Sequence, residues 1–71
     1  MNIGTLKEIK NNENRVGLTP KGVEILKNGE HNIFVEHNAG KEAGYTDEDY
    51  ISSGAKILPK EDIWKNSDII I

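Results

Sequence analysis

The feature that most constrains the fold is a repeated order, in which a short apolar stretch is followed by a helix-start signal. Asn2 to Leu6 has the composition of a short strand, and His31 to Glu36 contains an uninterrupted I-F-V run. An apolar run without alternation is typical of a parallel strand that is covered on both faces. Ala55 to Leu58 and Asp68 to Ile71 are two further short strand candidates.

A first helix is predicted between the first two strands. Thr19 is a good N-cap residue, and Pro20 follows at the first helical position, where its missing N–H group costs nothing. The predicted apolar side of this helix consists of Val23, Ile25 and Leu26. Gly29 is expected to end the helix as a left-handed cap.

A second helix start follows the second strand. Thr46 is the predicted N-cap, and Asp49, three residues later, is its partner in a capping box. Tyr45 and Tyr50 have the spacing of a hydrophobic staple. Gly54 is expected to cap the end of this helix.

Pro59 to Asn66 is predicted to form one or two further turns of helix that carry Ile63 and Trp64. The resulting order β-α-β-α-β-α-β predicts an α/β fold with a parallel sheet and right-handed crossovers. The sequence ends within the last predicted strand, where three isoleucines would be poorly placed at an exposed edge. We therefore expect residues 1–71 to be part of a longer protein.

Composition narrows the classes of function. With 71 residues the chain is at most one small domain with a thin core. It has no cysteine, and His31 and His37 do not have a recognised metal-ligand spacing, so neither a disulfide nor a metal site is predicted. The absence of cysteine and of an apolar leader indicates a cytoplasmic protein, and no apolar run is long enough to span a membrane. A net charge of −3 without a basic stripe argues against nucleic-acid binding.

The long polar connection from Lys7 to Pro20 is the first candidate for a functional site. It is roughly twice the usual 2 to 6 residues of a strand-to-helix loop, and it holds Arg15, the sole arginine of the chain. Ligands of open parallel sheets bind outside the carboxyl ends of the strands, which is where Lys7, Glu8 and Arg15 are expected. A guanidinium can bind a carboxylate through two charge-assisted hydrogen bonds. The plainer alternative is a surface ion pair with a nearby glutamate.

The loop from Asn38 to Gly44 is expected at the same edge of the sheet. Its glycines, Gly40 and Gly44, fit neither the dinucleotide-binding pattern nor the P-loop pattern, so we interpret them as turn residues. No arrangement of Ser, His and Asp, of Cys and His, or of paired carboxylates has a usable catalytic spacing. No catalytic residue is therefore predicted within the chain.

The residues then resemble a known family. The segments K-E-I-K-N-N-E-N-R-V-G-L-T-P, H-N-I-F-V-E-H-N-A-G-K-E-A-G-Y-T-D-E-D-Y and G-A-K-I-L look like the N-terminal part of the alanine dehydrogenase family. This family is related to the alpha subunit of nicotinamide nucleotide transhydrogenase. The resemblance implies that residues 1–71 are the N-terminal part of an incomplete Rossmann-like, doubly wound substrate domain, whereas the NAD-binding Rossmann domain is absent from this chain.

The resemblance also implies a function for the complete protein. It would be a reversible NAD-dependent oxidative deamination of L-alanine to pyruvate and ammonia by a homo-oligomer, a hexamer in the family. Arg15 would bind the substrate carboxylate, while a second substrate-binding lysine, a catalytic histidine and the NAD site would lie beyond this sequence. The fragment alone is expected to be inactive.

Three other interpretations remain open at this stage. The chain could be the same segment of a transhydrogenase subunit, in which hydride moves between two nicotinamide nucleotides and no amino acid is bound. It could be a free-standing α/β binding module, which predicts a well-folded monomer. It could also persist by pairing with copies of itself through the unfinished strand at Ile69 to Ile71.

Overall fold

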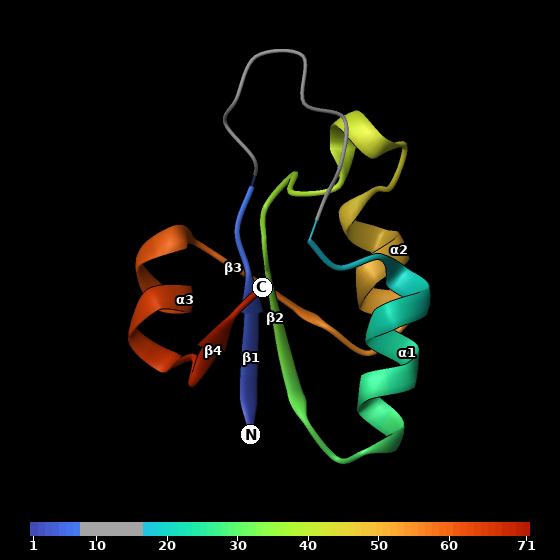
Figure 1. Ribbon diagram of the computed structural model, residues 1–71. Coiled ribbons are helices and arrows are strands. Elements are labelled where there is room, and N and C mark those ends of the chain that lie inside the picture. The colour runs from blue at the N-terminus through green and yellow to red at the C-terminus, as the bar shows by residue number, and fades with distance from the viewer. Residues whose placement is uncertain (8–16) are drawn as a thin grey trace.

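A computed structural model describes residues 1–7 and 17–71 of the chain (Figure 1). Strands and helices alternate in the predicted order. In chain order the elements are β1 (Asn2–Thr5), α1 (Pro20–Asn28), β2 (Asn32–Glu36), the short 3-10 helix η1 (Lys41–Ala43), α2 (Asp47–Ser52), β3 (Lys56–Leu58), α3 (Lys60–Asn66) and β4 (Ile69–Ile70). The strands are each one or more residues shorter than expected, but each lies where it was predicted.

The four strands form one sheet in the order β3-β2-β1-β4, and every neighbouring pair is parallel. In the central pair, Asn2 of β1 lies opposite Asn32 of β2, and this register continues to Thr5 opposite Val35. On the other side of β1, Ile3 lies opposite Ile69. The predicted parallel α/β architecture is therefore confirmed.

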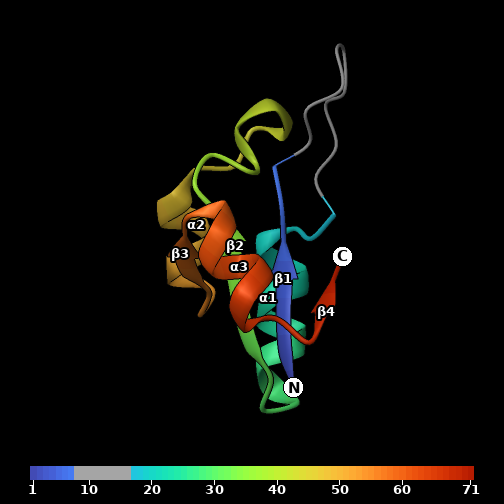
Figure 2. The same ribbon diagram turned by 90° about the vertical axis from the view of Figure 1, so that its left-hand side faces the viewer.

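The helices cover both faces of this sheet. Helices α1 and α2 lie side by side on one face and α3 lies on the other, as the two perpendicular views show (Figures 1 and 2). The chain first moves outward from β1 to β2 and β3, using α1 and α2 as crossovers. It then returns across the opposite face through α3 and adds β4 to the free side of β1. This reversal makes the fold doubly wound.

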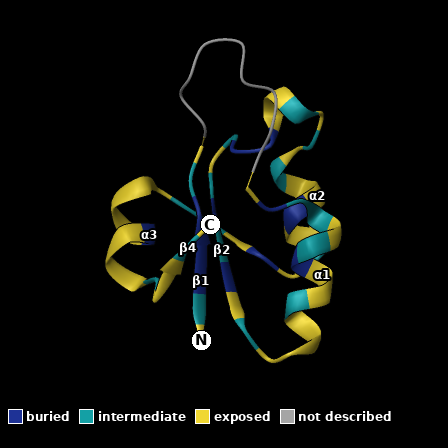
Figure 3. Cartoon of the chain, in the orientation of Figure 1, coloured by how far each residue is buried: buried dark blue, intermediate teal, exposed yellow. Residues whose placement is uncertain are grey.

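The main core lies between the sheet and the pair α1 and α2, where the buried residues of Figure 3 concentrate. Tyr50 of α2 is its largest fully buried side chain. The cluster consists of Ile3, Leu18, Val23, Ile33, Val35, Ala39, Tyr50 and Ala55. Because Ile33 and Val35 alternate with a residue that points to the other face, β2 contributes to both layers.

The opposite face is closed by α3, whose Ile63 is fully buried. Gly4 lies directly beneath this helix, since a Cβ atom added at Gly4 would lie 2.6 Å from Cγ2 of Ile63 and closer still to Oγ of Ser67. Phe34, the neighbour of Gly4 in the sheet, is half-buried. Glycine in β1 thus permits close packing of α3, which explains a residue that otherwise weakens a strand.

Both predicted helix starts are confirmed. Oγ1 of Thr19 accepts a hydrogen bond from the backbone N–H of Gly22 at 3.1 Å, with Pro20 as the first helical residue. Thr46 and Asp49 form the complete capping box, in which each side chain accepts the backbone N–H of the other residue. Such caps satisfy backbone donors that would otherwise remain unpaired.

The helix ends agree less well with the sequence. Gly54 follows α2 with a left-handed φ of 110°, as expected, but the prediction of a left-handed Gly29 is wrong, since its φ is −89°. Glu30 takes the left-handed conformation instead, with a φ of 65°. Helix α1 reaches Asn28, so the left-handed position falls one residue later than predicted. Gly29 is tightly packed, because its missing Cβ would lie 3.2 Å from the ring of His31.

Two apolar residues of the helices, Ile25 and Trp64, lie outside the core. Ile25 is 60 % exposed, which corrects the expected apolar side of α1: Val23 and Leu26, three residues apart, face the core, and Ile25 does not. On α3, Ile63 is buried whereas Trp64 is 58 % exposed. Within the described ranges, no helix is long and apolar enough to cross a membrane.

Candidate functional site

The reversal of the strand order places a candidate site at the carboxyl ends of β1 and β4. The backbone N–H of Ile71 donates to the carbonyl of Gly4 at 2.8 Å, and the hydroxyl of Thr5 donates to the carbonyl of Ile71 at 3.2 Å. The chain leaves β1 toward α1 on one face of the sheet and reaches β4 through α3 on the other face (Figure 2), and doubly wound sheets bind ligands beyond the strand ends where the strand order reverses in this way. We name this position, formed by Thr5, Gly17 and Ile71, the switch point.

Gly17 brings the returning chain onto the switch point. A Cβ atom at Gly17 would lie 2.8 Å from the carbonyl oxygen of Ile71 and 3.1 Å from Oγ1 of Thr5. The absence of a side chain therefore lets the backbone at Gly17 lie against the ends of β1 and β4. The sequence between Lys7 and Gly17 thus starts and finishes near the carboxyl ends of the strands.

The first end of this connection is held by a neighbouring strand. The backbone N–H of Lys7 donates to Oε1 of Glu36 at 2.8 Å, which ties the exit of β1 to the end of β2. Hydrogen bonds in which the acceptor is ionised are stronger than neutral ones. Glu36 therefore fixes where the chain leaves the sheet.

The second end of this connection, at Leu18, is bound by a side chain of α2. The hydroxyl of Tyr50 donates to the backbone carbonyl of Leu18 at 2.8 Å in a fully buried environment. Burial, with smaller contributions from the nearby Tyr45, Asp49 and Asp47, raises the pKa of the Tyr50 hydroxyl from 10.0 to about 12. The hydroxyl consequently stays protonated and remains a donor throughout the neutral range.

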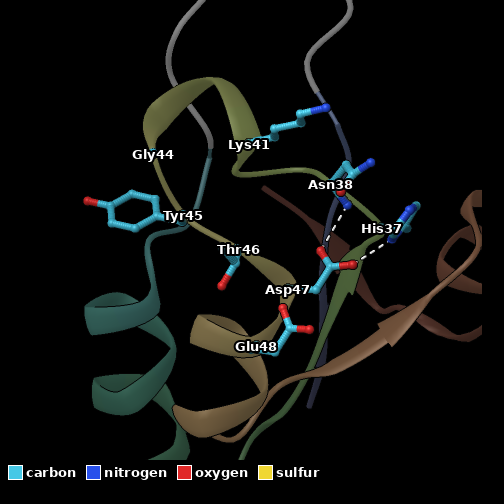
Figure 4. A pocket seen from close by; sticks show the side chains of 8 residues that line it. All are labelled: His37, Asn38, Lys41, Gly44, Tyr45, Thr46, Asp47 and Glu48. Carbon is cyan, nitrogen blue, oxygen red and sulfur yellow. Dashed lines mark hydrogen bonds and ion pairs between the residues drawn. The ribbon is translucent and has the colours of Figure 1, made fainter.

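A cavity of about 480 Å³ lies farther along the same edge, between the end of β2 and the start of α2 (Figure 4). Nδ1 of His37 and Oδ2 of Asp47 lie 2.5 Å apart, and Oδ1 of Asp47 accepts the backbone N–H of Asn38 at 2.9 Å. Asn38 has a left-handed φ of 64°, a conformation that asparagine tolerates better than most residues. The lining residues are His37, Asn38, Lys41, Gly44, Tyr45, Thr46, Asp47 and Glu48.

The polar groups of this cavity mainly hold the loop to the helix. Both carboxylate oxygens of Asp47 are engaged by the loop, and the hydroxyl of Thr46 accepts the N–H of Asp49 within the helix cap. Lys41 and Glu48 contribute charges of opposite sign. Among residues 1–7 and 17–71, no group of three or more His, Cys, Asp or Glu side chains could hold a metal ion. The cavity therefore has no evident preference for one class of ligand.

The structure tests some of the residues predicted for the site and not others. Lys7 and the loop from Asn38 to Gly44 lie at the carboxyl edge of the sheet, as expected. Glu8 and Arg15 lie outside the described residues, so the predicted carboxylate-binding role of Arg15 stays a prediction. His37, for which no metal-ligand role was predicted, is exposed and pairs with Asp47.

The glycines of this edge do not form a dinucleotide-binding loop. Gly40 is buried against Tyr50, where an added Cβ would lie 2.6 Å from the hydroxyl oxygen, and Gly44 ends η1 with a left-handed φ of 92°. Both lie in turns, as the sequence indicated, and Gly40 in addition packs against Tyr50. The described residues therefore do not fit an NAD site, since such a site needs glycines that approach a pyrophosphate.

Two contacts of the site were missed by sequence reasoning. Tyr50 was interpreted as half of a hydrophobic staple, and its ring does lie edge-on to Tyr45 at 6.2 Å, but its hydroxyl bond to Leu18 joins residues 32 positions apart. Asp47 lies in the first turn of α2, and its carboxylate also binds the backbone N–H of Asn38 just beyond the end of β2. Neither partner has a local sequence signal, because the contacts arise from the crossover geometry.

The chain is similar to alanine dehydrogenases over its whole length. The sequence profile described as "Alanine dehydrogenase/PNT, N-terminal domain" matches residues 4–71. An alanine dehydrogenase of Methanococcus maripaludis is 44 % identical over 100 % of this chain, and one of Staphylococcus epidermidis is 48 % identical over 100 % of it. The chain spans 19 % of the length of each of these relatives.

Solved structures give the same result. A structure of L-alanine dehydrogenase superposes with a TM-score of 0.93 at 43 % identity, covering 100 % of this chain and 20 % of the other. A transhydrogenase from Sinorhizobium meliloti superposes with a TM-score of 0.92 at 30 % identity, covering 99 % of this chain and 21 % of the other. On the profile match, the identities and the shared fold, the chain belongs to the alanine dehydrogenase/PNT N-terminal domain family.

Proposed function

We propose that this chain is the N-terminal part of the substrate domain of an NAD-dependent L-alanine dehydrogenase. The full-length protein would catalyse the reversible oxidation of L-alanine by NAD⁺, with water, to pyruvate and ammonium. NAD would be bound by a second domain outside these 71 residues, in keeping with the packing roles of Gly40 and Gly44. The observation that carries the proposal is the 44 % to 48 % identity to alanine dehydrogenases over the whole chain.

Within this function, we assign the substrate carboxylate to Arg15. The support comes from the two flanks of the segment. Lys7 is bound to the end of β2, and Gly17 lies against the ends of β1 and β4. This is the position at which doubly wound sheets bind ligands. A guanidinium fork binds a carboxylate in two parallel hydrogen bonds, which orients as well as holds the substrate.

The remaining chemistry is assigned to the rest of the protein. No catalytic acid or base is proposed within residues 1–71, so the isolated chain is expected to be inactive. A cytoplasmic location and assembly into a homo-oligomer, as in the family, complete the proposal. The chain's contribution would be to form one wall of the substrate site and to position the carboxylate.

The experiment is an assay of alanine-dependent NAD⁺ reduction by the full-length protein that carries this segment. Wild type is compared with Arg15→Ala and with the conservative Arg15→Lys. Each charge-assisted hydrogen bond is worth about 1.5–3 kcal/mol, so Arg15→Ala should raise the KM for alanine by at least roughly tenfold. Unchanged kinetics in Arg15→Ala would remove Arg15 from the site while leaving the enzyme class in place.

A transhydrogenase is the second candidate, favoured by the superposition at 30 % identity with the Sinorhizobium meliloti structure. The higher identity of 43 % to the L-alanine dehydrogenase structure is why we rank it second. The same assay separates the two. A full-length protein that transfers hydride between nicotinamide nucleotides, and shows no alanine-dependent reduction of NAD⁺, would contradict the first proposal.

A further inference from the structure

The hydroxyl of Tyr50 forms a hydrogen bond that is not needed to fill the core. Tyr50 of α2 is completely buried in the core between the helices and the sheet, where a phenylalanine would fill nearly the same space. Its hydroxyl nevertheless donates to the carbonyl of Leu18 at 2.8 Å. Leu18 precedes the N-cap of α1, and it is the residue after Gly17 of the switch point.

The donor is held in one place by its surroundings. A Cβ atom at Gly40 would lie 2.6 Å from the Tyr50 hydroxyl oxygen. Glycine at this position therefore leaves just enough space for the hydroxyl group. The ring of Tyr45 lies edge-on to the Tyr50 ring at 75°. The capping box at Thr46 fixes the start of α2. A donor on a rigid helix, inside a packed core, can position its acceptor accurately.

The acceptor lies on the segment that reaches the substrate edge. Leu18 is itself buried, and Gly17 next to it lies against the carbonyl of Ile71 and the hydroxyl of Thr5. The hydrogen bond therefore fixes the chain immediately before it arrives at the ends of β1 and β4. Losing the bond would leave a buried carbonyl unpaired, and the segment could relieve that cost by shifting.

We infer that Tyr50 is a positioning residue of the substrate site, which holds Leu18, and through it Gly17, in register with the ends of β1 and β4. The inference rests on the proposed function and deepens it. Tyr50 touches neither substrate nor cofactor in this scheme. It acts by fixing the backbone from which the carboxylate-binding segment extends, and small displacements of such a segment are costly to substrate binding.

The test uses the full-length enzyme and the single change Tyr50→Phe, which removes one oxygen atom and keeps the ring. We expect the KM for pyruvate to rise on the order of tenfold, because a small displacement of the carboxylate-binding segment weakens substrate binding, while kcat stays within about twofold. Ile63→Val is the matched control, because it also weakens the packing of a fully buried side chain, but Ile63 belongs to α3 on the other face of the sheet. Its KM should equal that of the wild type.

A double-mutant cycle with Arg15→Lys separates this inference from the proposed function. If Tyr50 acts through the carboxylate site, Tyr50→Phe should raise the KM by less than about twofold in the Arg15→Lys background. An unchanged KM in Tyr50→Phe, an equal rise in Ile63→Val, or strictly multiplicative effects would each overturn the inference. Unchanged kinetics in Arg15→Lys and Arg15→Ala would instead overturn the assigned site, whatever Tyr50→Phe does.

Discussion

Gly4 offers a quantitative test of how α3 packs on the sheet. In Gly4→Ala, the new methyl group would lie 2.6 Å from Cγ2 of Ile63, about 0.8 Å inside the 3.4 Å at which ordinary contact begins, and it would also meet Oγ of Ser67 and, at 3.2 Å, Cδ1 of Ile70. Because the contacts come from α3 and from β4, no single side chain can move aside to relieve them.

The expected cost follows from two opposing effects. Overpacking a well-packed core costs about 1–3 kcal/mol, whereas replacing glycine with alanine restricts the unfolded chain and returns about 0.4–1 kcal/mol. We therefore expect Gly4→Ala to be destabilised by about 1–2 kcal/mol, and its Tm in thermal unfolding followed by circular dichroism to fall by several degrees.

The control is the double variant Gly4→Ala with Ser67→Ala. Removing Oγ of Ser67, the atom nearest to the new methyl group, should recover part of the lost stability, but Ile63 still obstructs the methyl group. A Gly4→Ala protein with the Tm of the wild type would refute the close packing of α3 on β1. Full recovery in the double variant would show that the contact with Ile63 carries none of the cost.

Three further predictions concern α2. Thr46→Ala removes the capping box and should cost about 1 kcal/mol in thermal unfolding, and a Thr46→Ser variant that lost as much would contradict the cap. Asp47→Ala should increase the hydrogen-exchange rate of the Asn38 amide that it accepts, whereas Glu48→Ala, at an exposed neighbouring position, should leave that rate unchanged. Because the pKa of Tyr50 is raised from 10.0 to about 12, the stabilisation from its protonated hydroxyl is complete below pH 10.0 and is lost as the pH rises through about 12, so the Tm of the wild type should fall more steeply over that interval than that of Tyr50→Phe. Parallel curves would refute the assigned pKa.

The sequence predicted the elements well because their signals are local. Thr19 with Pro20, and Thr46 with Asp49, satisfy backbone groups within one helical turn, so the residues that start each helix are adjacent in sequence. The apolar run of β2 likewise indicated a strand between two layers, which the structure confirms.

The features that the sequence predicted wrongly, or did not predict, depend on exact positions or on contacts between residues far apart in the chain. Gly29 was assigned the left-handed conformation that Glu30 adopts, because a sequence does not fix the last residue of a helix. Ile25 is apolar but faces outward, as a single apolar residue can at little cost. The bond between Tyr50 and Leu18 required the crossover itself to be known.

The most direct test of the central claim compares L-alanine with L-alaninamide, which lacks the carboxylate, as substrates of the full-length enzyme. If Arg15 binds the substrate carboxylate beside the switch point, the wild type should prefer alanine in kcat/KM by on the order of 10- to 150-fold more than Arg15→Ala does, since charge-assisted hydrogen bonds are worth about 1.5–3 kcal/mol. An Arg15→Ala enzyme that keeps the full preference for alanine would contradict the assignment of the carboxylate site to this segment.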